Sequence, residues 1–219
     1  MNIAIDGPAG AGKSTVAQKV AGRLEFVYID TGSMYRALAW AVLHNGVPVD
    51  DEQAVSDLLQ NNTIELQRVN SVQRVLWNGR DITEEIRTPE VSQYASIVAS
   101  YGSVRRQMLV LQRKMAEQGN VVMDGRDIGT HVLPDAEVKI FLTASIRERA
   151  ERRLKELLAK GHVTDLETLE AEIAERDKRD MERDVAPLRQ AEDAVLVDTT
   201  GLSIDQVVDR ILQICELNG

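Results

Sequence analysis

The feature that most constrains the fold is a glycine-rich segment near the beginning of the sequence. Residues 7–14 read Gly-Pro-Ala-Gly-Ala-Gly-Lys-Ser and match the pattern G-x-x-x-x-G-K-[ST]. The run Asn-Ile-Ala-Ile-Asp precedes them directly, and Val16, Val20 and Leu24 follow at helical spacing. A strand, this loop and a helix in that order predict a phosphate-binding P-loop in an α/β core. The alternative is a glycine-rich turn with no ligand.

The residue types of this loop suit a triphosphate accompanied by a magnesium ion. Glycines allow a tight turn that aims backbone amides inward, while Lys13 would place a positive charge on the outer phosphates and Ser14 a hydroxyl on Mg²⁺. The segment predicted to bind the nucleotide consists of Gly7, Pro8, Ala9, Gly10, Ala11, Gly12, Lys13, Ser14 and Thr15.

Length and composition exclude several other classes of protein. A chain of 219 residues with one cysteine, Cys215, is long enough for one domain without disulfides, and Cys215 is expected to be a buried structural thiol. The formal charge of −9 disfavours sequence-independent binding to nucleic acid. We expect a cytoplasmic monomer without a signal segment or membrane span. The three histidines are scattered, so no structural metal is expected.

Hydrophobic patterning predicts an α/β fold with about five parallel strands and one insertion. The expected strands lie near residues 2–6, 26–30, 121–124, 138–142 and 194–197, with helices near 14–24, 31–45, 146–160 and 203–217. Between them, residues 64–66, 72–77 and 81–82 alternate around an Asn-Gly turn and predict a small antiparallel sheet. A short helix within 47–62 and helices at 89–100 and 103–118 flank this sheet.

A further helix is expected to begin at Thr164, which has the spacing of a capping box with Glu167. Its buried face carries Leu166, Leu169 and Ile173 and then becomes charged, with Arg176, Arg179, Asp180 and Arg183. Two interpretations remain open, a solvated helix end with i,i+4 ion pairs or a ligand cleft. The arginine-rich helix before it, with Arg147, Arg149, Arg152 and Arg153, is equally compatible with a solvated face and with a lid over phosphates.

Polar residues also follow two of the predicted parallel strands, at the sheet edge where such folds bind ligands. In the segment after the strand at 121–124, Asp124 would lie near the metal and Lys13, Arg126 could bind a phosphate, and Asp127 could accept from a base or orient an arginine. After the second strand, Thr31 and Arg36 are the candidates.

More cationic side chains would meet there than one triphosphate needs. Arg36, Arg126, Arg176, Arg179 and Arg183 would face Lys13 if these segments share a cleft. Such an excess suits two phosphorylated molecules whose repulsion must be cancelled before in-line transfer. A phosphate acceptor has a second pKa of about 6 and needs no catalytic base, and none is evident in the sequence.

The sequence resembles the bacterial cytidylate (CMP/dCMP) kinases from Ile3 to about Leu212. The resemblance rests on the P-loop and on the segments at residues 30–36, 81–82, 86–87, 124–130, 139–142, 175–177, 179–180 and 186–188. It implies the nucleoside-monophosphate kinase fold and Mg²⁺-dependent transfer from ATP to CMP or dCMP. It also implies a core of residues 1–44, 101–148 and 184–219, a monophosphate-binding insertion at about 45–100 and a lid at about 149–183.

The resemblance also implies individual roles. Thr31, Arg36, Arg126 and Arg183 would surround the acceptor phosphate, and Arg176 with Asp180 the sugar. Lys13, Arg126 and Arg183 are the expected catalytic residues, with Ser14 on the metal and Asp124 contacting it through water. Ser96, Arg105 and Asp127 would recognise cytosine, whose amino group donates while N3 and O2 accept. From spacing alone, Ser96 and Arg105 would be expected on exposed helix faces.

Two alternatives remain. Another small P-loop kinase, in particular one that prefers UMP, would differ in the residues that recognise the base. A nucleotide-binding switch would leave the second group of arginines unused, and the sequence contains no Asn-Lys-x-Asp guanine-binding motif.

Overall fold

The computed structural model describes residues 1–69, 72–117 and 119–218. The chain divides into two compact units, one formed by Met1–Val27 and Gly119–Gly219 and the other by Tyr28–Gln118. This second unit begins before and ends after the insertion expected at 45–100. The monophosphate-binding role of the insertion and the role of residues 149–183 as a lid stay predictions.

A five-stranded sheet with the order β2-β6-β1-β7-β8 forms the centre of the α/β architecture. Its strands are β1 (Asn2–Asp6), β2 (Val27–Asp30), β6 (Val121–Gly125), β7 (Val138–Thr143) and β8 (Val195–Asp198). β1 pairs in parallel with β6, with Ile5 opposite Asp124, and on its other side with β7. Because β1 and β6 are buried along nearly their whole length, they consist of apolar runs without alternation.

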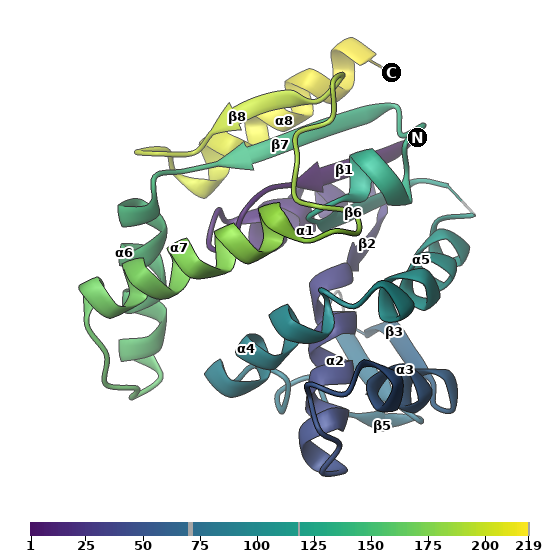
Figure 1. Cartoon of the computed structure of the whole chain (residues 1–219). Helices are drawn as coiled ribbons and strands as arrows, with labels where there is room; N and C mark the ends of the chain where they lie inside the picture. Colours follow the sequence, from purple (N-terminus) through teal and green to yellow (C-terminus); the bar gives the residue numbers. More distant parts are fainter. Residues whose placement is uncertain (70–71, 118, 219) are drawn as a thin grey trace. The chain divides into compact units, whose positions relative to one another are not determined.

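The helices of the first unit are α1 (Lys13–Leu24), α6 (Ile146–Ala159), α7 (Leu166–Glu182) and α8 (Ile204–Asn218), with a short π-helix, η1 (Ile128–Val132). Lys19 of α1 and Asp205 of α8 form an ion pair of 2.7 Å. The helices α6 and α7 lie side by side (Figure 1) and share a small apolar cluster that includes Ala150, Leu157 and Ile173. These two helices therefore form a hairpin with its own core.

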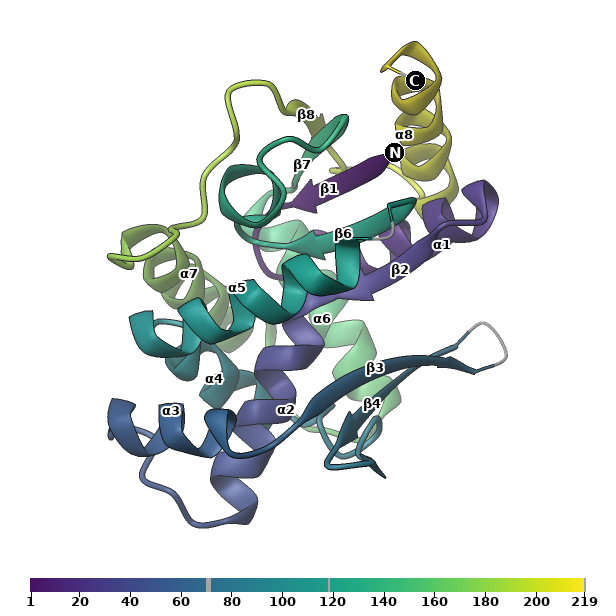
Figure 2. The same cartoon turned by 90° about the vertical axis from the view of Figure 1, so that its right-hand side faces the viewer.

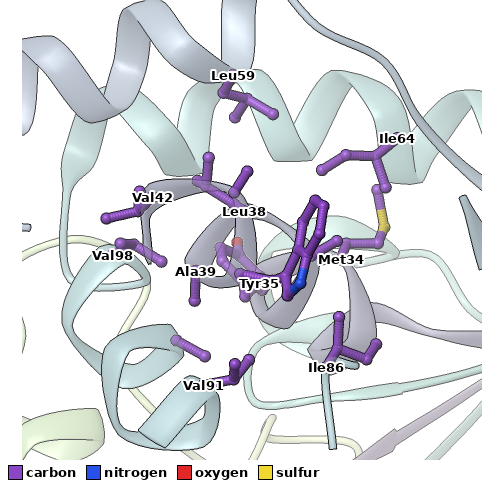
Figure 3. Close-up of a cluster of buried hydrophobic side chains, with 14 of the residues drawn as sticks. Met34, Tyr35, Leu38, Ala39, Val42, Leu59, Ile64, Ile86, Val91 and Val98 are labelled. Atoms are coloured by element: carbon purple, nitrogen blue, oxygen red, sulfur yellow. The ribbon is translucent and has the colours of Figure 1, made fainter. Parts of the chain in front are cut away.

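The second unit surrounds a separate hydrophobic core. It contains α2 (Thr31–His44), α3 (Glu52–Gln60), α4 (Pro89–Val98), α5 (Gly102–Ala116) and an antiparallel sheet of β3 (Ile64–Val69), β4 (Val72–Trp77) and β5 (Arg80–Asp81). The strands β3 and β4 run side by side as a hairpin (Figure 2), with Ile64 opposite Trp77. Met34 and Leu38 of α2 belong to the buried cluster in Figure 3, as do Ile86, Val91 and Val98.

The predicted order of helices and strands is confirmed, and most boundaries agree within two residues. The second strand, β2, begins at Val27, one residue later than expected, and is buried only at its carboxyl end, since 51% of the surface of Val27 is exposed. The capping residue of α7 is also shifted by one position. Asp165, not Thr164, accepts the hydrogen bond from the Thr168 amide. The last residue expected in the second of the two middle helices, Gln118, lies outside the described residues.

Cys215 is buried on α8 as predicted, and burial raises the pKa of its thiol to about 11. Within the described ranges, no helix is long and apolar enough to cross a membrane.

Candidate functional site

The P-loop connects the carboxyl end of β1 to the first turn of α1. Gly7 has φ +152°, and a Cβ atom there would lie 2.1 Å from the carbonyl oxygen of Leu142. Gly12 adopts φ +86° as the N-cap of α1, a left-handed conformation that favours glycine. The glycines predicted to shape this loop are therefore required by a close backbone approach and by the turn into the helix. The start of α1 presents backbone amides to an anion.

Lys13 is enclosed at the base of this loop, with 6% of its surface exposed. Its Nζ donates to the carbonyl oxygen of Pro8 at 2.8 Å. Burial lowers the pKa of Lys13 well below its usual value of 10.5, and the charges of Arg126 and Arg176 lower it further, while Asp124 and Asp6 oppose them. A phosphate group in the loop would supply the negative charge that favours the protonated amine.

Ser14 and Asp124 form the pair of oxygen donors expected beside the P-loop. The Ser14 hydroxyl donates to Oδ2 of Asp124 at 3.0 Å, although the two residues are far apart in sequence. A hydroxyl and a carboxylate are hard ligands of the kind that Mg²⁺ takes together with phosphate oxygens and water. The donor set thus fits a magnesium ion bound with a nucleotide. Within the described ranges, no group of three or more His, Cys, Asp or Glu could hold a metal by itself.

The first unit also brings together several of the charged residues expected to bind the acceptor. Nε of Arg126 donates to Oδ2 of Asp180 at 3.0 Å. The guanidinium of Arg183 lies 3.8 Å from Asp180 and 3.6 Å from Asp127, and it donates to the carbonyl oxygen of Ala186. Burial would raise the pKa of Asp180, but the positive charges of Arg126, Arg176 and Arg183 hold it below 3.8. This carboxylate is therefore ionised and organises the arginines around it.

The interpretation of this end of α7 as a solvated helix face holds for Arg179, which pairs at i,i+4 with the exposed Glu175, but it is wrong for Asp180 and Arg183. The side chains of Asp180 and Arg183 are only 5% and 4% exposed. Ion pairs at such burial lie in a low-dielectric environment where they are screened far less than on a surface. The alternative, a charged cleft beyond Ile173, agrees with this burial.

Sequence reasoning missed the role of Arg149, which was considered only as part of a solvated or lid helix. Its guanidinium forms two hydrogen bonds to the Asp177 carboxylate, of 3.0 and 2.6 Å. It also donates to the carbonyl oxygen of Ala9 in the P-loop at 2.9 Å and to that of Ala144 at 3.0 Å. The arginine-rich sequence of this helix did not distinguish the two cases, since Arg147, two residues earlier, forms an exposed ion pair with Glu151. One helix thus carries both a buried and a solvated arginine.

The contacts of Asp6, the last residue of β1, were also not predicted from the sequence. Asp6 is 4% exposed and accepts hydrogen bonds from the backbone amides of Ile128 and Gly129 at 2.8 and 2.7 Å. The available signal was an acidic residue directly after the apolar run Ile-Ala-Ile of this strand.

The remaining candidate residues belong to the second unit. Asp30 caps α2 by accepting from the Ser33 amide at 3.0 Å, and its carboxylate also accepts from Nη2 of Arg36 at 3.0 Å. The same nitrogen of Arg36 donates to the Ser33 hydroxyl. Thr31 begins α2 and is 3% exposed. Asp30 and Ser33 therefore orient Arg36, a role not foreseen from the sequence.

Ser96 and Arg105 are buried, at 4% and 6% exposure, so the expectation of exposed helix faces for them is wrong. Arg105 donates to the carbonyl oxygen of Ala99 at 3.1 Å, and its guanidinium carbon lies 5.4 Å from the centre of the Tyr35 ring. A cation over an aromatic face is an attractive contact that helps fix the arginine. That these residues join those of the first unit in one site stays a prediction.

A P-loop on a five-stranded parallel sheet, with a buried lysine and a second group of arginines, defines a small P-loop kinase. Solved structures with this fold include a shikimate kinase from Acinetobacter baumannii and a gluconokinase from Sinorhizobium meliloti. Each has a TM-score of 0.50 over 99% of this chain and 93% of its own, at 15% and 16% identity respectively. At such identity the likeness shows the fold alone.

Sequence comparison identifies the family within this class. The cytidylate kinase family model matches residues 3–217. A cytidylate kinase of Geobacillus sp. (strain WCH70) is 58% identical over 98% of this chain and 96% of its own length. That of Bacillus subtilis (strain 168) is 55% identical over 99% and 96%. The chain belongs to the cytidylate kinase family, and the prediction of a nucleoside-monophosphate kinase is confirmed.

Proposed function

We propose that this enzyme transfers the terminal phosphoryl group of ATP to CMP and dCMP, giving ADP and CDP or dCDP. The observation that carries the proposal is the group of Arg126, Arg176 and Arg183 around Asp180. The charges of two of them, Arg126 and Arg176, also act on Lys13 in the P-loop. One triphosphate would leave much of this positive charge unused, whereas two phosphorylated substrates would use it. An acceptor that is itself a phosphate also accounts for transfer without a dedicated base.

In the proposed mechanism the chain positions both substrates and stabilises the charge that develops during transfer. The P-loop amides and Lys13 hold the outer phosphates of ATP, while Arg126 and Arg183 neutralise the acceptor and transferred groups. Ser14 and Asp124 would hold Mg²⁺, the latter through water, and the ion would offset charge on the donor phosphates. Each of these side chains is ordered by a protein contact before substrate binds, which lowers the cost of reorganisation.

The resemblance to the cytidylate kinases suggests which residues would recognise the acceptor. Arg36 and Thr31 would contact its phosphate, Arg176 and Asp180 its sugar, and Ser96, Arg105 and Asp127 its cytosine. A base whose donors and acceptors do not match this buried hydroxyl, guanidinium and carboxylate would bind less favourably. We further propose small-molecule substrates only, a monomer and a cytoplasmic location, all three inferred from the sequence.

A coupled assay of ADP release with ATP and Mg²⁺ tests the proposal by comparing CMP, dCMP, UMP and AMP under identical conditions. Preference for CMP or dCMP is expected. Preference for UMP would refute the assignment of the base-recognising residues while retaining the kinase, and inactivity with all four would refute the reaction.

Replacing Lys13 tests the role of the P-loop. For Lys13→Ala we expect kcat to fall by about 10²-fold or more, because a charge that stabilises the transition state is lost. Circular dichroism should remain unchanged. Lys19→Ala, on the exposed face of the same helix, is the matched control and should keep its activity. Turnover retained by Lys13→Ala would contradict the proposed role.

A further inference from the structure

Asp6 connects two segments that are distant in sequence but adjacent in the sheet. It ends β1, and its Cα partner in the neighbouring strand is Gly125, the last residue of β6. One carboxylate oxygen accepts from the amide of Ile128 at 2.8 Å and the other from the amide of Gly129 at 2.7 Å. Both oxygens of a buried carboxylate therefore bind the backbone that follows Arg126 and Asp127.

The backbone held by Asp6 has an unusual local conformation. Residues Ile128–Val132 form the π-helix η1, and Asp127 before it has φ −143° and ψ 25°. Single-turn π-helices are rare and occur frequently at functional sites. A Cβ atom at Gly129 would lie 3.2 Å from the Lys139 side chain and 3.4 Å from Oδ2 of Asp6, so the amide is approached closely from two strands. Asp6 thus holds a segment that does not follow a regular ladder.

We propose that Asp6 is a positioning residue for the acceptor, because its carboxylate fixes the turn that aims Arg126 and Asp127. The inference rests on the proposed function, in which these two residues bind the phosphate and the base of CMP. Asp6 itself touches neither substrate in this scheme. It acts through two backbone amides and affects acceptor binding more than donor binding.

The ionisation of Asp6 supports this role. The pKa of Asp6 is raised from 3.8 to about 6, mainly because the carboxyl group is buried. The two amide hydrogen bonds lower this pKa but do not outweigh burial. The negative charge of Asp127 raises it further, and the positive charge of Lys13 lowers it. Lys139, whose side chain lies beside Gly129, has its Nζ directed to Asp193 at 2.7 Å. At neutral pH the carboxylate is ionised and accepts both amides, whereas protonation below about pH 6 weakens that acceptor.

The variant Asp6→Asn tests the proposal because its amide is nearly isosteric but offers a single acceptor oxygen. We expect KM for CMP to rise by about tenfold or more, while KM for ATP stays within about twofold. The matched control is Asp51→Asn, since Asp51 also accepts a backbone amide, that of Ala54, but caps α3. The control should change neither constant.

The pH profile separates positioning from a merely structural contribution. In the wild type, KM for CMP should rise as the pH falls through about 6. The CMP phosphate titrates in the same range, with a second pKa of about 6. Its titration affects the wild type and Asp6→Asn equally and therefore cancels in the ratio of their KM values. The ratio of KM for CMP in Asp6→Asn to KM for CMP in the wild type should therefore approach one at low pH and be largest above pH 7. A ratio that is constant with pH would overturn the proposal.

A measurement on the wild type keeps the proposal testable if Asp6→Asn fails to fold. In the ¹⁵N spectrum of the unliganded protein, the amides of Ile128 and Gly129 should shift with a common midpoint near pH 6. Amides that do not titrate between pH 5 and 7 would refute the link. Catalytic inactivity with CMP would refute the proposed function alone, because these shifts do not depend on substrate.

Discussion

Several of the candidate residues carry charges that are nearly enclosed by protein. A carboxylate or guanidinium in such a place has lost most of its hydration and depends on the partners that protein contacts supply. Asp180 meets Arg126 and Arg183, Arg36 meets Asp30, and Lys13 meets a backbone carbonyl. Removing one member therefore also changes the orientation of the others.

Asp180 offers the sharpest test at the residue scale. For Asp180→Ala we expect KM for CMP to rise by about thirtyfold or more, because a buried, hydrogen-bonded charge partner is lost. KM for ATP should change little. Steady-state kinetics with each substrate varied in turn measures both constants. Glu182→Ala, an exposed position on the same helix, is the control. A selective defect in ATP binding would move the acceptor site elsewhere.

At the scale of secondary structure, α6 and α7 are joined by both apolar and ionic contacts. Their shared cluster is small, with Leu169 and Ile173 facing Ala150 and Leu157. The Arg149–Asp177 pair closes the same interface, with side-chain exposures of 5% and 11%. Because Arg149 also donates to Ala9, its guanidinium links the hairpin to the phosphate-binding loop.

Because the Arg149–Asp177 pair is buried, we expect its loss to destabilise the protein strongly. Asp177→Ala should lower the free energy of unfolding by about 3 kcal/mol, because Arg149 would remain buried without its carboxylate partner. Urea denaturation monitored by circular dichroism measures the change. Glu151→Ala, which removes the exposed partner of Arg147, should cost less than about 0.5 kcal/mol. Equal effects of the two substitutions would show that the buried pair contributes no more than a surface pair.

At the scale of the whole molecule, buried ionisable groups make the folding equilibrium depend on pH. The pKa of Asp6 is about 6 in the folded state and 3.8 is its ordinary value. The folded state therefore binds more protons than the unfolded state between these values, and stability from this group decreases as the pH rises.

We expect the wild type to lose about 3 kcal/mol relative to Asp6→Asn between pH 3.8 and pH values above 6, since the shift spans about 2 pKa units. The contribution is fully present below pH 3.8 and is lost as the pH rises through about 6. Urea denaturation of both proteins across this range measures the difference. A difference in unfolding free energy that does not vary with pH would contradict the raised pKa.

Local patterns in the sequence were sufficient for the strands, the helices and the P-loop. The β1–loop–α1 unit could be recognised from neighbouring residues, because the spacing of its glycines and the apolar spacing of α1 are local patterns. The resemblance of the motifs also supplied the family and its acceptor. The proximity of Arg126 and Arg183 followed from only one of the two interpretations that the sequence left open, the one in which their segments share a cleft.

Burial and pairing were decided by the tertiary structure. Whether an arginine on a helix faces water or a carboxylate depends on the element packed against it, which explains why Arg149 and Arg147 of α6 behave differently. The same reason applies to Ser96 and Arg105, which are buried although their helices show no local sign of it. Asp6 meets Ile128 and Gly129 only because β1 and β6 are adjacent in the sheet. The sequence by itself thus determined the chemistry available to this protein, and the packing of distant segments decided which charges are enclosed, because hydration is lost only where elements meet.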